Sequence, residues 1–358
     1  MKFKVSANLD NNYGDDEMLT MLAKKLSKHS LYVNPGRENL HMIPFEKLEN
    51  VYKYEKTNHF KKDFDGYIKL CGGITPFDGS ISSIIKTLMR IGLLAVYKLK
   101  KMNVIYIQTS TGNAHRGLGN RRTLVEKLLT KALLLFVDEI TVRHKSIFKE
   151  LRKLGVKKVK YYPDMVFSEV NNYDDPVKDS LGISVYRSIR NKKYNLDYLN
   201  KMVEIIDLYT TTTEGKVKLF AFDTAIENDL WMANLIYSKI KDKSKVEIIS
   251  HLSDSERFTK ELITCHTMIG VRFHSIVVAI REKIPVLPII YAEKTKSTLD
   301  DLNYNGKRIY LNNIKDENAE EIVNLLNNER DKINIYASEE YLLEANGHLA
   351  IFDKYNKG

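Results

Sequence analysis

The sequence predicts an α/β fold with two doubly wound, Rossmann-like domains that face each other across a cleft, an arrangement of the GT-B type. Short β-rich runs alternate with longer helical patterns, as a parallel α/β architecture requires. The polar stretch at residues 171–178 interrupts this alternation once, and the alternation then starts again. A chain of 358 residues is also too long for one typical core and suggests two domains of ordinary size.

The first domain is expected to span residues 1–170. We expect its strands at residues 2–6, 66–70, 104–108, 139–142 and 159–162. Helical segments should separate them, near residues 15–28, 80–100, 121–136 and 145–154. The helix that begins near Glu17, for example, places apolar residues at helical spacing, at Met18, Leu19, Leu22 and Leu26.

The second domain is expected to span residues 171–337. Its strands should lie at residues 181–185, 217–222, 246–249, 267–271, 286–290 and 308–311, with helices between them. The tail at residues 338–358 follows the last helix of this domain. We expect that tail to cross back and pack on the first domain.

The overall composition excludes several classes of protein. A hydrophobic content of 43% is enough for two cores, and no uncharged stretch is long enough to span a bilayer. The opening residues 1–5 look like a first strand rather than a signal peptide. The two cysteines, Cys71 and Cys265, lie far apart and form neither a disulfide framework nor a metal-ligand spacing. We therefore expect a reducing, cytoplasmic setting and no bound metal.

The net charge of +10 and the pI of about 9.2 imply attraction to polyanions or anionic membranes. Lysine and arginine are spread along the whole chain among 46 acidic residues, without a recognisable nucleic-acid-binding motif, so we do not expect nucleic acid as a partner. The segment 86–101 is the sharper basic feature, because it is largely apolar and carries cations at both ends. This pattern favours a helix that faces the core and extends its lysines to the solvent. The alternative interpretation is an interfacial helix that rests on anionic lipid.

Basic residues follow two of the expected strands. Arg272 and His274 come directly after the apolar run 267–271 and open a helical stretch. Arg143 stands at the end of the strand 139–142, and Ser146 follows it before an amphipathic helix. Ligands of open parallel sheets bind outside the carboxyl ends of the strands, where a helix N-terminus favours phosphate and carboxylate. Both groups should therefore face an anionic substrate.

Each of these residues also has a structural interpretation. His274 could be a hydrogen-bonded core histidine, and Arg143 could pair on the surface with a carboxylate such as Glu139 or Glu150. A third strand, at residues 3–6, runs into the turn 11–16, where Asp15 or Asp16 could cap the following helix. Lys294 could be a solvated lysine at a helix start. Gly72 and Gly73 should form a tight turn, which also lets the backbone approach a ligand closely.

Taken together, these strand ends resemble the polysaccharide pyruvyl transferase family. The family's N-terminal Asn-x-Gly-Asp turn matches residues 12–15, and its glycine cluster after an early strand resembles residues 71–74, with Cys71 in place of the first glycine. Its later motifs resemble Val142, Arg143 and Ser146, then Asp164 to Phe167, then Arg272, His274, Pro285, Tyr291 and Lys294. The matches follow the family's order over residues 12–294. Two departures stand out: His144 replaces the family's usual aspartate, and residues 108–112 replace its glycine-rich turn.

The resemblance implies an enzyme that moves pyruvate from phosphoenolpyruvate onto sugar hydroxyls as a ketal. The acceptor would be a nucleotide- or lipid-linked precursor of a surface polysaccharide, and no metal or other cofactor is required. The catalytic residues would be Arg143 and Arg272, whose planar forks suit carboxylate and phosphate, and His274 as the acid–base group. The implied substrate-binding residues are Asn12, Gly14, Asp15, Gly72, Gly73, Ser146, Asp164, Tyr291 and Lys294.

Two other functions remain open at this point. A GT-B glycosyltransferase would consume a nucleotide sugar in the same cleft. A non-catalytic protein that binds anionic glycan or a membrane would show binding without turnover. Kinases and α/β-hydrolases are poor candidates, because the sequence has neither a Walker P-loop nor a serine nucleophile elbow.

Overall fold

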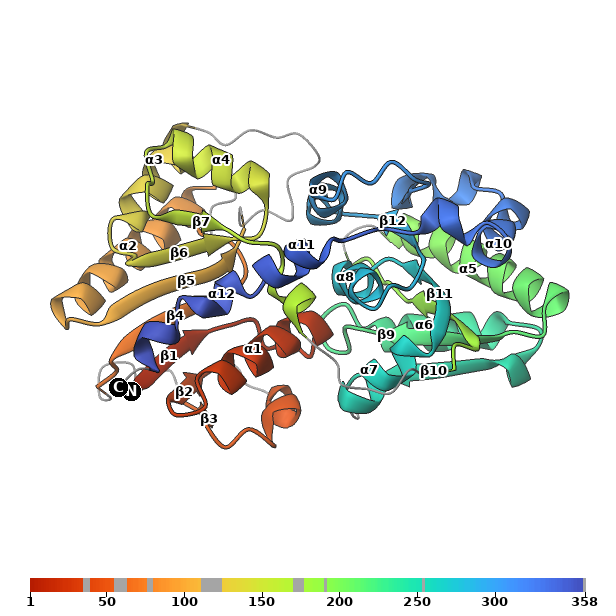
Figure 1. Ribbon diagram of the computed structural model, residues 1–358, viewed down its shortest axis with the longest axis horizontal. Coiled ribbons are helices and arrows are strands. Elements are labelled where there is room, and N and C mark those ends of the chain that lie inside the picture. Colours follow the sequence, from red (N-terminus) through yellow and green to blue (C-terminus); the bar gives the residue numbers. More distant parts are fainter. Residues whose placement is uncertain are drawn as a thin grey trace.

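The computed structural model describes residues 1–34, 39–54, 63–75, 80–110, 124–169, 177–189, 192–252 and 255–356. Two parallel sheets with helices on their faces form two lobes, seen side by side in Figure 1. The predicted fold class is confirmed. Parts of the polar stretch 171–178, the turn 108–112 and the start of the helix 121–136 lie outside the described residues.

The first sheet has seven strands in the order β3-β2-β1-β4-β5-β6-β7, and all its pairs are parallel. Its strands are β1 (Lys2–Ser6), β2 (Ser30–Val33), β3 (Val51–Lys53), β4 (Gly66–Leu70), β5 (Asn103–Thr109), β6 (Glu139–Val142) and β7 (Val159–Tyr161). The main helices of this domain are α1 (Tyr13–Lys25), α2 (Ile81–Leu99), α3 (Leu124–Leu134) and α4 (Lys145–Lys153). Strands β2 and β3 were not predicted from the sequence.

The second sheet has six strands in the order β10-β9-β8-β11-β12-β13, again all parallel. Its strands are β8 (Ser180–Ser184), β9 (Lys216–Ala221), β10 (Val246–Ser250), β11 (Cys265–Gly270), β12 (Val286–Ile290) and β13 (Ile309–Tyr310). The helices that accompany it are α5 (Lys192–Thr212), α6 (Asp229–Lys239), α7 (Ser255–Ile263), α8 (Phe273–Arg281), α9 (Glu293–Asp301) and α10 (Ala319–Asn327).

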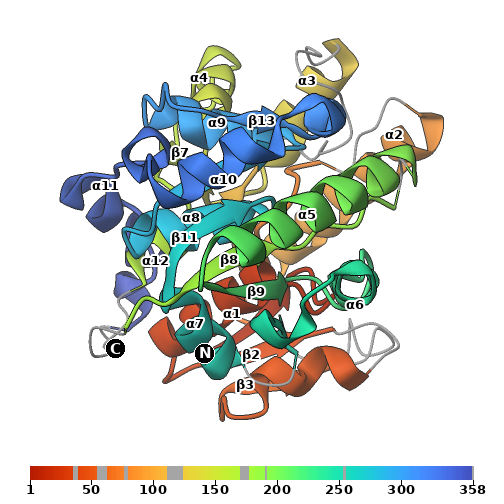
Figure 2. The ribbon, with the colours of Figure 1, turned by 90° about the vertical axis from the view of Figure 1, so that its right-hand side faces the viewer.

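Strand order reverses between β1 and β4 in the first sheet, and between β8 and β11 in the second. In open α/β sheets such a reversal opens a crevice at the carboxyl ends of the strands. The loops that follow β1, β4 and β11 carry the residues singled out in the sequence, so the topology brings them to the crevices. Figure 2 shows the second lobe face on, with α8 beside β11.

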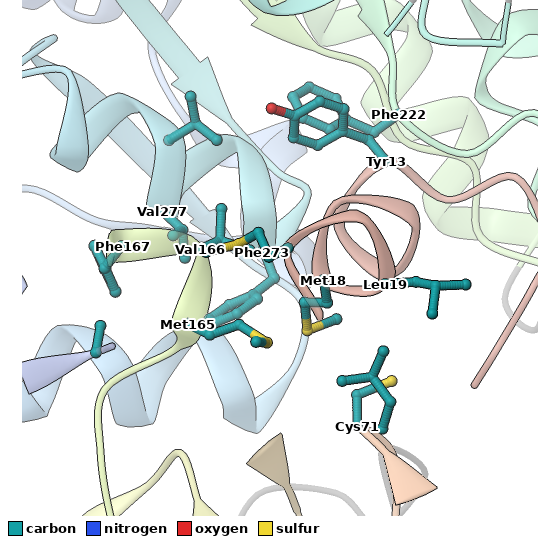
Figure 3. Close-up of a cluster of buried hydrophobic side chains, with 14 of the residues drawn as sticks. Tyr13, Met18, Leu19, Cys71, Met165, Val166, Phe167, Phe222, Phe273 and Val277 are labelled. Atoms are coloured by element: carbon teal, nitrogen blue, oxygen red, sulfur yellow. The ribbon is translucent and has the colours of Figure 1, made fainter. Parts of the chain in front are cut away.

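A single hydrophobic core continues from the first sheet into the second. It includes Phe3 of β1 and Val286 of β12, both of which are fully buried. Figure 3 shows the part of this core where the lobes meet: the ring of Tyr13 packs edge-on against Phe222, with centroids 5.4 Å apart. The backbone N–H of Tyr13 also donates to the carbonyl of Phe222 at 2.9 Å. These contacts fix the start of α1 against the second lobe.

The C-terminal segment packs on the lobe with which the chain begins, and Figure 1 shows the two termini close together. It includes α11 (Glu339–Glu344) and α12 (Gly347–Ala350). His348 is fully buried; its Nδ1 lies 2.7 Å from Thr141 Oγ1 and its Nε2 lies 2.9 Å from the carbonyl of Pro163. Farther on, Lys354 pairs with Glu139 at 2.9 Å.

The core-facing interpretation of segment 86–101 is confirmed only in part, because Leu94 and Tyr97 are buried in the core of the first domain while other apolar residues of the segment face outward. The face of α2 that packs inward carries Ser83, Thr87, Leu94 and Tyr97, whereas Leu88 and Leu99 are more than half exposed. Helical periodicity gives the angle of an apolar stripe around the axis but not the direction in which that stripe points. Among the described helices, none is both long enough and apolar enough to span a bilayer.

Candidate functional site

A cavity of about 420 Å³ lies between the two lobes, at the carboxyl ends of the central strands. Its walls come from the loops after β1, β4, β5 and β6, and from the N-terminal parts of α8 and α9. This size falls within the usual range of small-molecule sites. Eight of the predicted site residues line it: Asn12, Asp15, Gly72, Gly73, Arg143, Ser146, His274 and Lys294.

Arg143 lines the cavity, and two side chains hold its guanidinium in place. Its Nη1 donates to Asp164 Oδ2 at 2.8 Å, and its guanidinium lies over the ring of Phe273, 5.0 Å from the centroid. Burial raises the pKa of Asp164 and is the largest single influence on it, but the charge of Arg143 and the hydrogen bonds from Arg143 and Val166 act with other neighbouring groups, and the pKa falls below its ordinary value. Asp164 lies behind Arg143 rather than on the cavity wall, and its Oδ1 accepts the N–H of Val166 at 3.1 Å. Its contacts hold the arginine in place.

Two lysines add positive charge to the cavity. Lys69, on β4, and Lys294, on α9, both line it. Burial is the main cause that lowers the pKa of each to about 8; the charge of Arg90 contributes at Lys69 and that of Arg143 at Lys294. A cation with a lowered pKa in a cavity gains from an anion that restores its charged form. Lys69 was not predicted; a lysine in an otherwise apolar buried strand was the available signal.

Two of the histidines that line the cavity have buried ring nitrogens without a hydrogen-bond partner among the described residues. His274 is 7% exposed and His144 is 4% exposed, and both line the cavity. Among the described residues, neither Nε2 of His274 nor either ring nitrogen of His144 has a hydrogen-bond partner. Burial lowers the pKa of each imidazole to about 3, so both are neutral near pH 7. Buried polar atoms without partners are rare in native proteins, which sets these two imidazoles apart from histidines that serve only to pack a core.

The glycine of the Asn12–Asp15 turn has a steric role. Gly14 packs directly against His274, and a Cβ built on Gly14 would overlap the imidazole ring. Asn12 caps α1 by accepting the N–H of Gly14 at 3.3 Å. The turn from the first lobe therefore sets the position of a histidine from the second lobe, although Gly14 does not itself line the cavity.

We expect Gly14→Ala to lower the free energy of unfolding by about 1–3 kcal/mol, the usual range for overpacking a core. In a His274→Ala background the same change should cost almost nothing, because the overlapping ring is gone. Urea unfolding of the two single variants and the double variant measures this coupling. Gly92→Ala is the matched control, since a Cβ there meets nothing within 4 Å. An equal cost of Gly14→Ala in both backgrounds would contradict the proposed contact.

The turn after β4 has the left-handed backbone that favours glycine. Gly72 has a φ of +72°, and Cys71 adopts a φ of +52° although it is not glycine. The Cys71 thiol donates to Asp15 Oδ1 at 3.1 Å, and burial raises the pKa of both groups. Gly73 pairs with Ser110 in a short parallel bridge. The turn thus brings backbone and small side chains to the cavity wall.

Three helices begin at this cavity without a side-chain cap. The N-cap residues of α4, α8 and α9 are His144, Arg272 and Ala292, and in the described structure none of their side chains caps its own helix. At α4 the first N–H instead bonds Asp301 at 3.3 Å. Uncapped N–H groups and the helix dipole both favour an anion.

The structure places Arg272 and Tyr291 outside the cavity lining. Arg272 is 5% exposed, and its guanidinium donates hydrogen bonds to two carboxylates. Nε donates to Asp229 Oδ2 at 2.8 Å and Nη2 donates to Asp229 Oδ1, while Nη1 donates to Glu227. Tyr291 stacks on Tyr186 with centroids 4.5 Å apart. In the described structure Arg272 therefore belongs to an internal ion-pair cluster at the start of α8, and its contact with the substrate stays a prediction.

Among the described residues, no group of three or more His, Cys, Asp and Glu side chains is arranged to hold a metal ion. The cavity is lined by the cations Lys69, Arg143 and Lys294, by two neutral histidines and by three carboxyl side chains, those of Asp15, Glu150 and Glu293.

Known structures confirm the fold. UDP-GlcNAc 2-epimerase from Methanocaldococcus jannaschii, in complex with UDP-GlcNAc and UDP, has a TM-score of 0.58 at 13% identity and covers 100% of both chains. MnaA from S. aureus, in a co-structure with UDP, has a TM-score of 0.63 at 12% identity, over 99% of this chain and 96% of the other. At such identities the likeness shows the GT-B-like fold alone.

No curated protein sequence matches the chain. The profile of the polysaccharide pyruvyl transferase family matches residues 12–293, a range that begins at the Asn12 turn and ends beside Lys294. This range contains both sheets' carboxyl-end loops and nearly all of the cavity wall. The chain belongs to the polysaccharide pyruvyl transferase family.

Proposed function

We propose that the protein transfers pyruvate from phosphoenolpyruvate to two hydroxyls of a sugar, as a ketal, on a nucleotide- or lipid-linked precursor of a surface polysaccharide. The observation that carries the proposal is the cavity lining: Lys69 and Arg143 from the first lobe and Lys294 from the second line it together with His274. Phosphoenolpyruvate carries a carboxylate and a phosphate a few bonds apart, and that pair of anions fits these cations. Cytoplasmic location is part of the proposal, because both cysteines are free and buried.

The reaction has a simple balance of atoms. The first sugar hydroxyl attacks C2 of phosphoenolpyruvate and loses its proton, while C3 gains one and becomes a methyl group. The C2–O bond to phosphate then breaks, and the second hydroxyl closes the ketal as its proton leaves with phosphate. No electrons are exchanged with a third compound, so the reaction needs no redox cofactor.

His274 is the group that we assign to the hydroxyl proton. Burial lowers its pKa to about 3, so the imidazole is neutral and able to accept a proton near pH 7. Its Nε2 lies 3.8 Å from Asp164 Oδ2, close enough for that carboxylate to stabilise the imidazolium once it forms. Asp164 therefore serves both Arg143 and His274 as a positioning residue.

Arg143→Lys should weaken phosphoenolpyruvate binding at least about tenfold, because lysine keeps the charge but loses the planar fork that pairs with carboxylate or phosphate. Arg143→Ala should weaken it further. Calorimetric titration with phosphoenolpyruvate measures the change. Arg152→Lys, at an exposed position of α4, the helix that follows Arg143, is the control. Parent-like affinity in Arg143→Lys would show that this arginine does not bind the donor.

Turnover should survive exhaustive chelation with EDTA. The cavity wall supplies its positive charge through side chains, which can neutralise the leaving phosphate. Phosphate release from phosphoenolpyruvate, followed before and after chelation, tests this expectation. Loss of release that one divalent ion restores would show that carboxylates such as Asp15 or Asp164 bind a metal during the reaction.

The function is tested by supplying phosphoenolpyruvate and nucleotide sugars, separately and together, with a panel of lipid- and nucleotide-linked acceptors. Mass spectrometry of the acceptor and an assay of released phosphate follow the reaction. The proposal predicts an acceptor heavier by one pyruvate ketal, with phosphate released in equal amount. Transfer of a sugar without consumption of phosphoenolpyruvate would identify a glycosyltransferase instead.

A further inference from the structure

The solvent face of α2 is apolar, in reverse of the usual pattern for a surface helix. Leu94 and Tyr97 are buried, whereas six of its large hydrophobic residues lie along one outward stripe and are between 36% and 83% exposed: Ile81, Ile85, Leu88, Met89, Val96 and Leu99. Small polar residues take part of the inward face, where Ser83 and Thr87 are buried. An exposed apolar patch of this length marks an interaction site rather than ordinary surface.

Helix α3 packs beside α2 and continues the patch. Four apolar side chains on it and just after it are between 46% and 73% exposed: Leu124, Val125, Leu128 and Leu135. Figure 1 shows both helices at the left of the molecule, away from the second lobe. We call these ten residues of α2 and α3 the apolar plateau.

The charges around the plateau have one sign. Residues 81–101 contain five cations and no acidic residue, and residues 124–136 contain two lysines and a single acid. That acid, Glu126, is 2% exposed, so it does not contribute an outward negative charge. Lys98 pairs with Asp138, just beyond α3, at 2.8 Å. The remaining cations are Lys86, Lys100, Lys101, Lys127 and Lys131, whereas Arg90 lies on the side of α2 that faces Tyr67 and Lys69 of the sheet.

An apolar stripe with cations beside it is typical of helices that lie in the interface of an anionic bilayer. A second copy of the chain would bring like charges face to face across the plateau, which disfavours a self-association. A bilayer with anionic headgroups satisfies both features at once. We propose that the apolar plateau docks the protein on anionic membrane, with α2 and α3 parallel to the surface.

The position of the plateau relates it to the cavity. Helix α2 follows the Cys71–Gly73 turn after β4, and α3 follows β5 and Ser110; both the turn and Ser110 line the cavity. The N-terminal ends of the two helices therefore lie on the cavity side of the first sheet. A protein docked in this way holds its cavity near the headgroups, which suits an acceptor whose sugar is linked to lipid. That last step rests on the proposed function, whereas the docking itself does not.

The test is co-sedimentation of the full chain with vesicles of phosphatidylcholine, with and without phosphatidylglycerol, at low and high salt. Binding should require the anionic lipid and should weaken as salt screens the charges. Each cation near an anionic surface contributes about 1 kcal/mol, so Lys100→Gln with Lys101→Gln should lower the partition coefficient roughly 30-fold. Leu88→Gln with Leu99→Gln should lower it at least about tenfold, through lost apolar contact.

Two controls separate docking from other effects. Leu196→Gln with Leu343→Gln changes leucines that are 60% and 75% exposed on α5 and α11, and should leave vesicle binding unchanged. Arg143→Ala removes a cavity cation and should also bind vesicles as the parent does, so a failure of the proposed catalysis leaves this test intact. Equal partition to both kinds of vesicle, or to neither, would overturn the proposal. So would a parent dimer that Leu88→Gln dissociates in analytical ultracentrifugation.

Discussion

His274→Ala is expected to lower turnover by roughly two to four orders of magnitude, the usual scale for the loss of a general acid–base group. The imidazole lines the cavity, is neutral because burial lowers its pKa to about 3, and has an unpartnered Nε2 in the described structure. The measurement is phosphate release from phosphoenolpyruvate at saturating acceptor. The fold should stay intact, as circular dichroism can show.

The control for this variant is His266→Ala. His266 belongs to β11 of the same sheet but does not line the cavity, and its Nε2 lies 3.0 Å from Tyr209 Oη. That variant should keep turnover within a small factor of the parent. Parent-like activity in His274→Ala would remove the imidazole from the mechanism and leave only its packing against Gly14.

Arg272→Ala should lower the free energy of unfolding by about 3–5 kcal/mol, the usual cost of removing one partner from a buried ion pair. Asp229 is fully buried and would lose its bidentate cation, and Glu227 would lose its partner. Urea unfolding gives the change. Arg257→Ala, which removes an exposed arginine paired with Glu247 at 3.3 Å, should cost less than about 1 kcal/mol.

This result would also decide between two roles for Arg272. The sequence favoured a direct contact with phosphoenolpyruvate, whereas the structure gives Arg272 two internal carboxylates. A stable Arg272→Ala variant that fails to bind phosphoenolpyruvate would restore the substrate contact. An unstable variant whose folded fraction still binds it would support the internal cluster.

The fold could be predicted because parallel α/β units leave a strong periodic signal. The strands that were missed, at residues 30–33 and 51–53, are short and lie at one edge of the first sheet. The periodicity of α2 identified a helix but could not give the side that faces the core. That side depends on what α3 and β5 present to it, and no local pattern records those contacts.

The site could be predicted in part, through ordered motifs at strand ends. Eight predicted residues line one cavity although they come from both ends of the chain. Arg272 does not line the cavity of the described structure, because a strand-end arginine is equally suited to an anionic ligand and to carboxylates such as Asp229, 43 residues away in the chain. Lys69 was overlooked because it sits within a strand. The steric role of Gly14 could not be predicted, because it depends on His274, which lies far away in the sequence and packs against it in the fold.

The central claim is that this cavity forms a ketal by breaking the C2–O bond of phosphoenolpyruvate. The most direct measurement uses phosphoenolpyruvate labelled with heavy oxygen at the bridge between C2 and phosphorus, together with the panel of acceptors. Mass spectrometry then locates the label. The account predicts that the heavy oxygen leaves in phosphate while the acceptor gains an unlabelled pyruvate ketal. Label retained on the three-carbon unit, or no phosphate released with any acceptor, would contradict it.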